Sequence, residues 1–399
     1  MKRSLLPLAA LAAFAAARPA HAGNCADLAN PIYLQVGDTQ VNLMRQLARK
    51  LRDNTAKPLT LVWITSGSCS NIDLIYNHNP ATGITGTMSY VPSTAEDPAF
   101  NPATGTLLTC TPPPALFPDI ANSALYNDAC TTIAQTNPAV GKTNGPIQGY
   151  VLAVPEASNE HAITFEEAYF VFGFGQPGMV MPWMDESQMF IRTATKSTLL
   201  AWSLQLGIPA AKMHGQKLDG SPMVVSSLQT STSPQAAIGV LGVEVYDPLR
   251  STLNALAYRA KGQYAAYYPD STPTAFDKQN IRDGHYVVWS PTVWMQNLTG
   301  TTPTNADADY VVQLIAGHVV TPAPNFVITD IEASVGVVPD CAMAVTRDFE
   351  QGPLRAYTPA TSCTCRYEYV TTGLSSCETC SATTPCATGV CRNNYCEAR

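Results

Sequence analysis

A hydroxyl-rich turn that follows an apolar run is the segment of this sequence best suited to binding chemistry. Residues 61–64 read Leu-Val-Trp-Ile, and Ser66, Ser68 and Ser70 come directly after them. A short apolar run of β-forming residues predicts a buried parallel strand, and the apolar positions from Ile72 onward predict a helix. The first amides of that helix lack partners within it, so with the serine hydroxyls they suit a phosphate-like or carboxylate group. Simple helix capping by the serines explains the same residues.

Two more turns of this kind occur in the chain. Residues 32–36 predict a strand that ends in the turn at 37–40, which contains Thr39, and residues 189–192 predict a strand that ends in the hydroxyl-bearing turn at 193–198. Helical patterns follow both turns. Strands that alternate with helices predict an α/β fold with parallel-type sheets and flanking helices. Three such turns favour convergence on one ligand.

The first residues read as a secretory signal. Lys2 and Arg3 precede an apolar run, and Ala20-His21-Ala22 is a small-x-small cleavage site, so residues 1–22 are predicted to be a signal peptide cut near Ala22. Asn24, before Cys25, is larger than the residue that a lipoprotein signal normally offers. No later run reaches the roughly 18 apolar residues of a membrane helix. The sequence therefore predicts a periplasmic or secreted protein without a transmembrane segment.

The composition excludes one class of partner. The formal net charge is −7, and only 13% of the residues are charged. Binding to a phosphate backbone needs a basic face, so no nucleic acid partner is expected. Gly67-Ser68-Cys69 does not fit a hydrolase elbow, and no nucleophile with a matching base stands out. We therefore expect no enzyme activity, no cofactor and no metal.

The twelve cysteines predict disulfides, because the count is even and the chain is exported. Zinc binding by the C-terminal cluster is disfavoured because the cluster has no histidine. The tail contains seven cysteines, so one of them is expected to pair with Cys341. The sequence does not reveal which cysteines are paired. A disulfide from Cys69, with Cys110 and Cys130 as nearby partners, is favoured over a reactive thiol, and it would brace the 66–70 turn against the irregular segment 77–118. The candidates are Cys25, Cys69, Cys110, Cys130, Cys341, Cys363, Cys365, Cys377, Cys380, Cys386, Cys391 and Cys396.

The chain resembles the phosphate-type periplasmic solute-binding proteins, the receptors of the ABC transporter substrate-binding superfamily with a type II fold. Single motifs are weak, but their order and spacing from about residue 30 to 294 are fairly specific. The cysteine-rich tail lies outside the family pattern. The segments that carry the likeness are residues 32–39, 65–69, 119–123, 149–155, 163–167, 192–198, 237–240 and 280–286.

The resemblance implies two α/β lobes joined by hinge strands, with a ligand enclosed between them. Lobe 1 would comprise residues 26–149 and 264–347, lobe 2 residues 150–263, and the tail, residues 362–399, would be a small disulfide-rich module. The implied partners are a small oxyanion (phosphate, sulfate or a small carboxylate) and an ABC permease or a cell-surface protein, with the receptor itself a monomer.

The family's anion-binding positions can be carried over one by one. They fall on Thr39, on Ser66 or Ser68, on Ser123, and on Arg192 with Ser197 and Thr198.

Two family aspartates are replaced, by Ala124 and Ala194. A carboxylate only accepts hydrogen bonds, so its loss removes the selection for a protonated anion. The loss of the other aspartate leaves Arg192 short of an orienting partner, while Lys196 adds a second cation or is a solvated helix start. Arg192 itself has the alternative of a surface or lobe-bridging ion pair. A cleft without an acid suits sulfate, an organic acid or no ligand.

Two function hypotheses follow. The first is an exported solute-binding protein that captures a small oxyanion without catalysis. The second is an extracellular structural or interaction protein on a degenerate binding fold, which docks a partner through its cysteine-rich tail. Met179, Met181, Met184 and Met189 around Trp183 are more simply explained by packing than by copper binding, and His285 with Asp283 by a structural turn.

Overall fold

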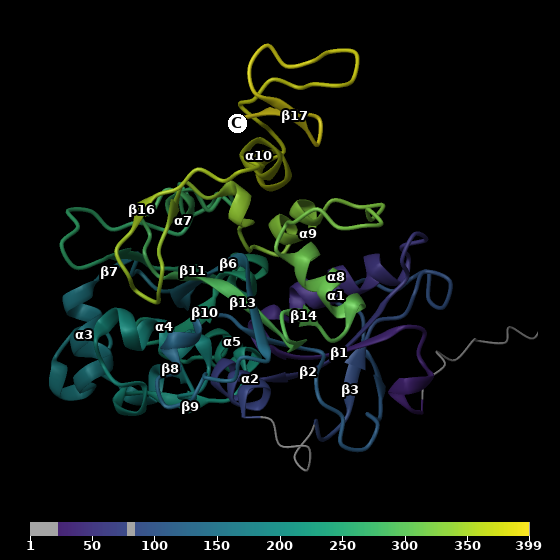
Figure 1. The fold of residues 1–399 in the computed structure, drawn as a ribbon. Coiled ribbons are helices and arrows are strands. Elements are labelled where there is room, and N and C mark those ends of the chain that lie inside the picture. Colours follow the sequence, from purple (N-terminus) through teal and green to yellow (C-terminus); the bar gives the residue numbers. More distant parts are fainter. Residues whose placement is uncertain (1–22, 78–83, 399) are drawn as a thin grey trace, which may run out of the picture.

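A computed structural model describes residues 23–77 and 84–398 (Figure 1). The predicted signal peptide and its cleavage site lie outside these residues. Among the described residues, twelve strands form one mixed sheet in the order β4-β3-β2-β1-β5-β13-β6-β10-β8-β9, with β11 beside β6 and β14 beside β13. We call the strands from β4 to β5 the β1 side of the sheet, and β10, β8 and β9 the β10 side.

The β1 side begins with two parallel strands and their helices. β1 (Pro31–Gly37) pairs with β2 (Thr60–Ser66) in parallel. α1 (Val41–Arg52) buries one apolar stripe that includes Leu43 and Leu47, as its period predicts. The other elements are η1 (Cys25–Asp27), η2 (Asp38–Gln40), α2 (Ser68–Tyr76), β3 (Met88–Tyr90), β4 (Leu108–Cys110), β5 (Ile120–Ser123) and η4 (Asn127–Ala129).

Two long antiparallel strands join the two sides. β6 (Val140–Pro155) pairs with β13 (Trp289–Thr299) along residues 140–149 and then with β10 along Tyr150 to Ala153. β13 also pairs with β5. The second half of β6, residues 148–154, is mostly apolar. The polar first half, 140–145, is strand because β13 supplies its hydrogen bonds, which is a tertiary effect.

The β10 side is a second α/β unit. β8 (Met189–Arg192) lies parallel to both β10 (Ile238–Gly242) and β9 (Gln216–Leu218). α3 (Phe165–Phe174) starts at a capping box formed by Thr164 and Glu167, and α4 (Ser197–Leu206) ends at Gly207, whose φ is +67°. The remaining elements are β7 (Ala162–Thr164), η5 (Gln176–Gly178), η6 (Glu186–Gln188), η7 (Ala210–Lys212), α5 (Ser221–Gln229), α6 (Val243–Tyr246), η8 (Asp247–Leu249), β11 (Leu253–Ala255), β12 (Ala257–Arg259) and α7 (Gln279–Arg282).

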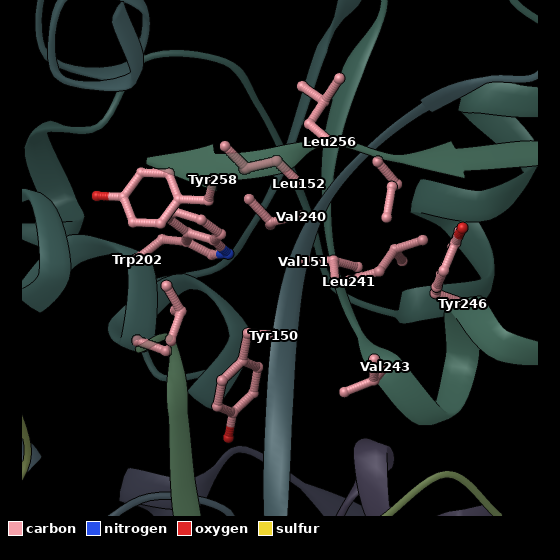
Figure 2. Close-up of a cluster of buried hydrophobic side chains, with 14 of the residues drawn as sticks. Tyr150, Val151, Leu152, Trp202, Val240, Leu241, Val243, Tyr246, Leu256 and Tyr258 are labelled. Atoms are coloured by element: carbon pink, nitrogen blue, oxygen red, sulfur yellow. The ribbon is translucent and has the colours of Figure 1, made fainter. Parts of the chain in front are cut away.

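Each side has its own apolar core. The core of the β10 side gathers around β6 and β10, where Trp202 and Tyr258 meet edge to face with ring centroids 5.0 Å apart (Figure 2). A second cluster on the β1 side packs α1, α8 and α9 against β1 and β2. Two separate cores joined by shared strands are the physical basis of a two-lobed fold.

The C-terminal part returns to the β1 side and ends in the cysteine-rich module. α10 (Thr364–Thr372) lies on α9 (Ile328–Ser334), and the hairpin of β17 (Val390–Arg392) and β18 (Tyr395–Glu397) projects from the body of the protein (Figure 1). The elements before it are β14 (Thr302–Pro303), α8 (Ala306–Ile315), η9 (Asp340–Ala342), β15 (Val345–Thr346) and β16 (Arg355–Ala356).

The predicted fold class is confirmed: the protein has a two-lobed α/β fold with a disulfide-rich C-terminal module. The lobe boundaries at residues 149, 263 and 347 stay a prediction. In the part of the chain that the structure describes, no helix combines the length and the apolar character needed to cross a membrane.

Candidate functional site

The turns that end β2 and β8 meet across the sheet. The amide of Cys69 donates to the carbonyl oxygen of Thr195 at 3.4 Å. A Cβ atom added to Gly67 would lie 2.8 Å from that same oxygen, so only glycine permits this approach. The 66–70 turn and the 193–198 turn, which the sequence singled out separately, therefore face one another at the carboxyl ends of parallel strands.

Arg192 joins the two sides of the sheet. Its side chain is fully buried, and Nη2 lies 2.7 Å from Oδ2 of Asp38, which follows β1. Nη1 donates to Oγ of Ser221 at 2.5 Å, and the backbone oxygens of Leu218 and Asp219 accept from Nε and Nη2 at 3.2 and 2.7 Å. The guanidinium is thus held by four groups, of which only the Asp38 carboxylate is charged.

The Asp38 carboxylate is also bound by the start of α5. Its Oδ2 accepts from the amide of Ser221 at 3.2 Å and from Oγ of Ser221 at 3.3 Å. An anionic group at a helix N-terminus, beside an arginine, is in a favourable field. We call Arg192 together with Ser221 the carboxylate cradle, because a carboxylate occupies it.

This geometry corrects the expectation that Arg192 lacks an orienting partner and that the cleft lacks an acid. Asp38 takes the role that Ala194 leaves open, from the opposite side of the sheet. Arg192 makes the lobe-bridging ion pair that the sequence offered as its alternative interpretation. The sequence does show an acid, Asp38, in the 37–40 turn. Asp38 and Arg192 are more than 150 positions apart, however, so only the fold shows that they are partners.

The predicted hydroxyl residues are buried, and most of their oxygens have internal partners. Thr39, Ser68, Ser123, Ser197 and Thr198 each expose less than 5% of their surface. Oγ of Ser68 accepts from the amide of Ala124 at 3.1 Å, and Oγ of Ser123 donates to the carbonyl of Leu125 at 2.8 Å.

Two of the predicted residues differ from this pattern. Oγ1 of Thr198 is buried without a hydrogen-bond partner among the described residues. Ser66 is only half-buried and lines a separate polar pocket of about 400 Å³ together with Gln35 and Asp73, so the structure does not bring it to Arg192.

Lys196 differs from the solvated helix start that the sequence favoured. It is the N-cap residue of α4, but its side chain is only 13% exposed, and Nζ lies 3.5 Å from Oδ1 of Asp219. Lys196 lies beside the cleft because the 193–198 turn folds against α5. It therefore adds a second positive charge near Arg192.

A buried polar chain that the sequence did not predict runs from η2 to α6. Nε2 of Gln40 donates to Oε1 of Gln148 at 3.2 Å, and Nε2 of Gln148 donates to Glu244. Burial raises the pKa of Glu244 to about 8, and the nearby charges of Asp38 and Asp247 contribute to the increase. The carboxyl of Glu244 is therefore mostly protonated near neutral pH.

A cleft of about 760 Å³ opens beside the cradle. Asp38 and Thr65 line it from the β1 side, and Lys196, Asp219 and Ser221 line it from the β10 side. One wall is apolar and is built mainly from α5, α6 and η8: Pro222, Met223, Val225, Val245, Pro248 and Leu249. The cleft thus has a charged end and an apolar wall.

The cysteines form six disulfides: Cys25–Cys110, Cys69–Cys130, Cys341–Cys363, Cys365–Cys377, Cys380–Cys391 and Cys386–Cys396. Cys69 is therefore not a reactive thiol. Its partner is Cys130, near η4, and Cys110 pairs with Cys25 instead. The expectation that the Cys69 disulfide braces the 66–70 turn against the irregular segment 77–118 is therefore wrong.

The other candidates have structural roles. Cys380, Cys386 and Cys391 form the one group of metal-ligand type found among the described residues, and each sulfur is committed to a disulfide. Trp183 is buried and Met179 and Met181 are exposed, so they do not form a joint site. Nδ1 of His285 lies 2.7 Å from Asp283 in an exposed turn.

No protein-family model matches the chain, and no curated protein matches it significantly. Among solved structures, the chain is similar to a phosphate ABC transporter substrate-binding protein from Clostridium perfringens with bound phosphate, at 13% identity and a TM-score of 0.51, over 78% of this chain and 99% of that one. A phosphate transport receptor from Vibrio cholerae aligns at 13% identity with a TM-score of 0.46, over 77% and 99% of the two chains. A PstS protein from Borrelia burgdorferi aligns at 11% identity with a TM-score of 0.40, over 78% and 99%. The first of these likenesses establishes the fold.

Proposed function

We propose that this chain is an exported, non-catalytic solute-binding protein that takes a small oxyanion between the β1 side and the β10 side. The carrying observation is the contact between Arg192 and Asp38. A fully buried arginine on one side is bound to an oxygen anion presented by the other side. An interlobe site built this way has affinity for anionic oxygen, and its closure depends on that anion.

Three further features support an anion ligand at this place. Two helices start at residues that line the cleft: Lys196 is the N-cap of α4, and Ser221 begins α5; helix N-termini favour anions. The hydroxyl of Thr198 is buried and unpartnered within the described chain, which leaves one donor free for a ligand. Lys196 adds a cation at the mouth of the cleft.

The wider role follows from the fold as part of the same proposal. The solved structure with a TM-score of 0.51 is that of a substrate-binding protein of a phosphate ABC transporter. We propose that the mature chain acts outside the cytoplasmic membrane as a monomer, delivers its ligand to a permease or a cell-surface partner, and performs no chemistry on it.

A second candidate function has one specific observation in its favour. Because Asp38 already neutralises Arg192, the two sides are held together without a ligand. A permanently closed fold of this kind would be an extracellular structural or interaction protein, with the projecting C-terminal hairpin as its docking element.

A thermal-shift screen of the mature protein separates the two candidates. Phosphate, sulfate, arsenate and small carboxylates are titrated at constant ionic strength. A ligand at about 100 times its dissociation constant adds about 2.7 kcal/mol to the free energy of unfolding. A rise of the melting temperature with any of these anions supports the solute-binding protein. No rise with any of them favours the structural role.

The variant Thr198→Val tests the site itself. It removes a buried hydroxyl without a partner and keeps the shape of the side chain, so the unliganded protein should be at least as stable as wild type. Loss of tenfold or more in anion affinity supports the assignment of Thr198. Thr292→Val is the control, because the hydroxyl of Thr292 is equally buried but hydrogen-bonded to Pro146 and Trp294, and its loss should lower stability without changing anion affinity.

A further inference from the structure

We propose that Asp38 is an internal competitor for the ligand: its carboxylate occupies a cradle that takes the carboxylate of a small organic acid, whose apolar part lies along the wall of α5. This inference rests on the proposed solute-binding role and names the class of ligand.

The cradle has the chemistry of a carboxylate site. Arg192 supplies a buried guanidinium, and Ser221 supplies an amide and a hydroxyl. All three donors converge on one oxygen, Oδ2 of Asp38. A free carboxylate has the same two oxygens in the same plane as Asp38. It can therefore accept hydrogen bonds from the same three donors in place of Asp38.

Asp38 is placed so that it can be displaced. Its side chain is 20% exposed, whereas that of Arg192 is fully buried. Asp38 lies in a short 3-10 turn at the wall of the cleft, and Ser221 lines the same cleft. An incoming acid therefore meets the cradle from the cleft, and the partly exposed Asp38 side chain is not enclosed by the protein.

The dimensions of the cleft favour an organic acid over a bare inorganic anion. Its volume of about 760 Å³ lies within the range of roughly 300–1,000 Å³ that is typical of organic ligand sites. The apolar wall formed by Met223, Val225 and Leu249 makes no favourable contact with a tetrahedral inorganic anion, but it can cover an alkyl or aryl group.

Charge argues in the same direction. Asp38, Asp219 and Lys196 line the cleft, and the buried Arg192 lies behind Asp38, to which it is bound. With the Asp38 carboxylate displaced but still nearby, a doubly charged inorganic anion meets more repulsion than a monocarboxylate does. The site thus selects its ligand by charge at the charged end of the cleft and by apolar contact along the wall of α5.

The test is chemical rescue of the variant Asp38→Ala. Acetate, butyrate and hexanoate are titrated into the wild-type protein and the variant, with chloride, phosphate and sulfate at equal ionic strength. We expect Asp38→Ala to melt at a lower temperature than wild type and to regain stability with the carboxylates but not with chloride. Affinity should be at least tenfold higher in the variant, because the competitor is gone. It should rise about threefold to fourfold for each added methylene group.

Three controls keep the outcome interpretable. Asp38→Asn keeps the shape of the side chain, so it replaces Asp38→Ala if the alanine variant does not fold. Asp38→Ala combined with Arg192→Gln should lose the rescue. Asp38→Ala combined with Met223→Ser, a half-exposed position, should keep the rescue by acetate and lose part of the gain with chain length.

The results separate this inference from the proposed function. If the wild-type protein binds phosphate or sulfate and Asp38→Ala gains no affinity for carboxylates, the solute-binding role stands and the inference is wrong. If the wild-type protein binds no anion but Asp38→Ala binds butyrate, the cradle is established and the solute-binding role fails. Equal rescue by chloride and acetate would overturn the cradle.

Discussion

Oδ2 of Asp38 lies 2.7 Å from Nη2 of Arg192, so the turn after β1 and the end of β8 are joined by an ion pair across the sheet. In the sheet, β5, β13, β6 and β10 lie between β1 and β8, and β13 and β6 are the strands that join the two sides. The pair therefore acts between lobes and not within one. Its strength decides how readily the two sides separate.

A double-mutant cycle measures this coupling. Removing one partner of a buried pair leaves an unpaired charge, so Asp38→Asn or Arg192→Met alone should lower the free energy of unfolding by about 3 kcal/mol. The double variant should lose less than the sum of the two single variants. Urea unfolding provides the measurement. The exposed pair of Arg355 and Asp348 is the control, for which little coupling is expected. Strict additivity for Asp38 and Arg192 would contradict an interlobe latch.

Gly67→Ala should open the interlobe contact without straining the backbone. The φ and ψ angles of Gly67 are −80° and 151°, which alanine adopts readily, but its Cβ would lie 2.8 Å from the carbonyl oxygen of Thr195. The turns must therefore move apart, and small-angle X-ray scattering should give a larger radius of gyration.

Gly37→Ala is the matched control for this variant. Gly37 also ends a strand before a helix, with φ −66° and ψ 150°, and its added Cβ meets Thr39 at an ordinary 3.5 Å. An unchanged radius of gyration in both variants would show that the turns can separate locally without movement of the two sides.

Glu244→Gln should remove a dependence of stability on pH. Burial raises the pKa of Glu244 from 4.5 to about 8, so between these values the folded state keeps a proton that the unfolded state has released. The free energy of unfolding therefore falls as pH rises from about 4.5 to 8 and levels off above that.

The expected size of this effect is up to about 5 kcal/mol, because the pKa rises from 4.5 to about 8 and each pKa unit corresponds to about 1.4 kcal/mol. The stability difference between Glu244→Gln and wild type should be smallest near pH 4.5 and should grow in favour of the variant up to pH 8. Urea unfolding across this range gives the profile, and the exposed Glu156→Gln is the control. A difference that is constant with pH would show that Glu244 is ionised throughout.

Removing either of two disulfides of similar span should lower stability by a similar amount, but only one of the removals should change ligand affinity. Cys69 and Cys130 are 61 residues apart, and Cys25 and Cys110 are 85 residues apart. Loop-closure entropy predicts that either loss lowers the free energy of unfolding by about 4 kcal/mol.

Only the loss of the Cys69–Cys130 bridge should weaken ligand binding. Cys69 is in the first turn of α2, and its amide contacts the carbonyl oxygen of Thr195. Calorimetric titration of the two double-serine variants, Cys69→Ser with Cys130→Ser and Cys25→Ser with Cys110→Ser, makes the comparison. Equal affinities in both variants would contradict a role of this bridge in the site.

Local patterns in the sequence predicted the elements around the site. The strand at residues 189–192 and the turns at 37–40 and 193–198 follow from short-range periodicity and turn chemistry. The partner of Arg192 did not follow, because the contact of Asp38 with Arg192 depends on the lobe arrangement. Glu244 was missed for the same reason: its burial comes from Gln148 and η2, which are distant in sequence.

The cysteine-rich module should depend on one buried carboxylate. Glu397 is 1% exposed, and its two oxygens accept from the amides of Cys365 and Arg366, at 3.1 and 3.0 Å, in the first turn of α10. It thus caps a helix that lies more than 30 residues earlier in the chain. Glu397→Ala should weaken the start of α10 by about 1–2 kcal/mol.

Hydrogen exchange localises this loss. Because the disulfides remain intact in Glu397→Ala, the amides at the start of α10 should exchange about tenfold faster or more, while those of α1 keep their protection. Glu378→Gln, an exposed position in the same module, is the control. Arg366 holds α10 to Asp330 of α9 at 2.6 and 2.7 Å, so faster exchange that spreads to α9 would mean that the cap also secures the module to the body. Unchanged exchange in α10 would mean that the helix does not need the Glu397 cap.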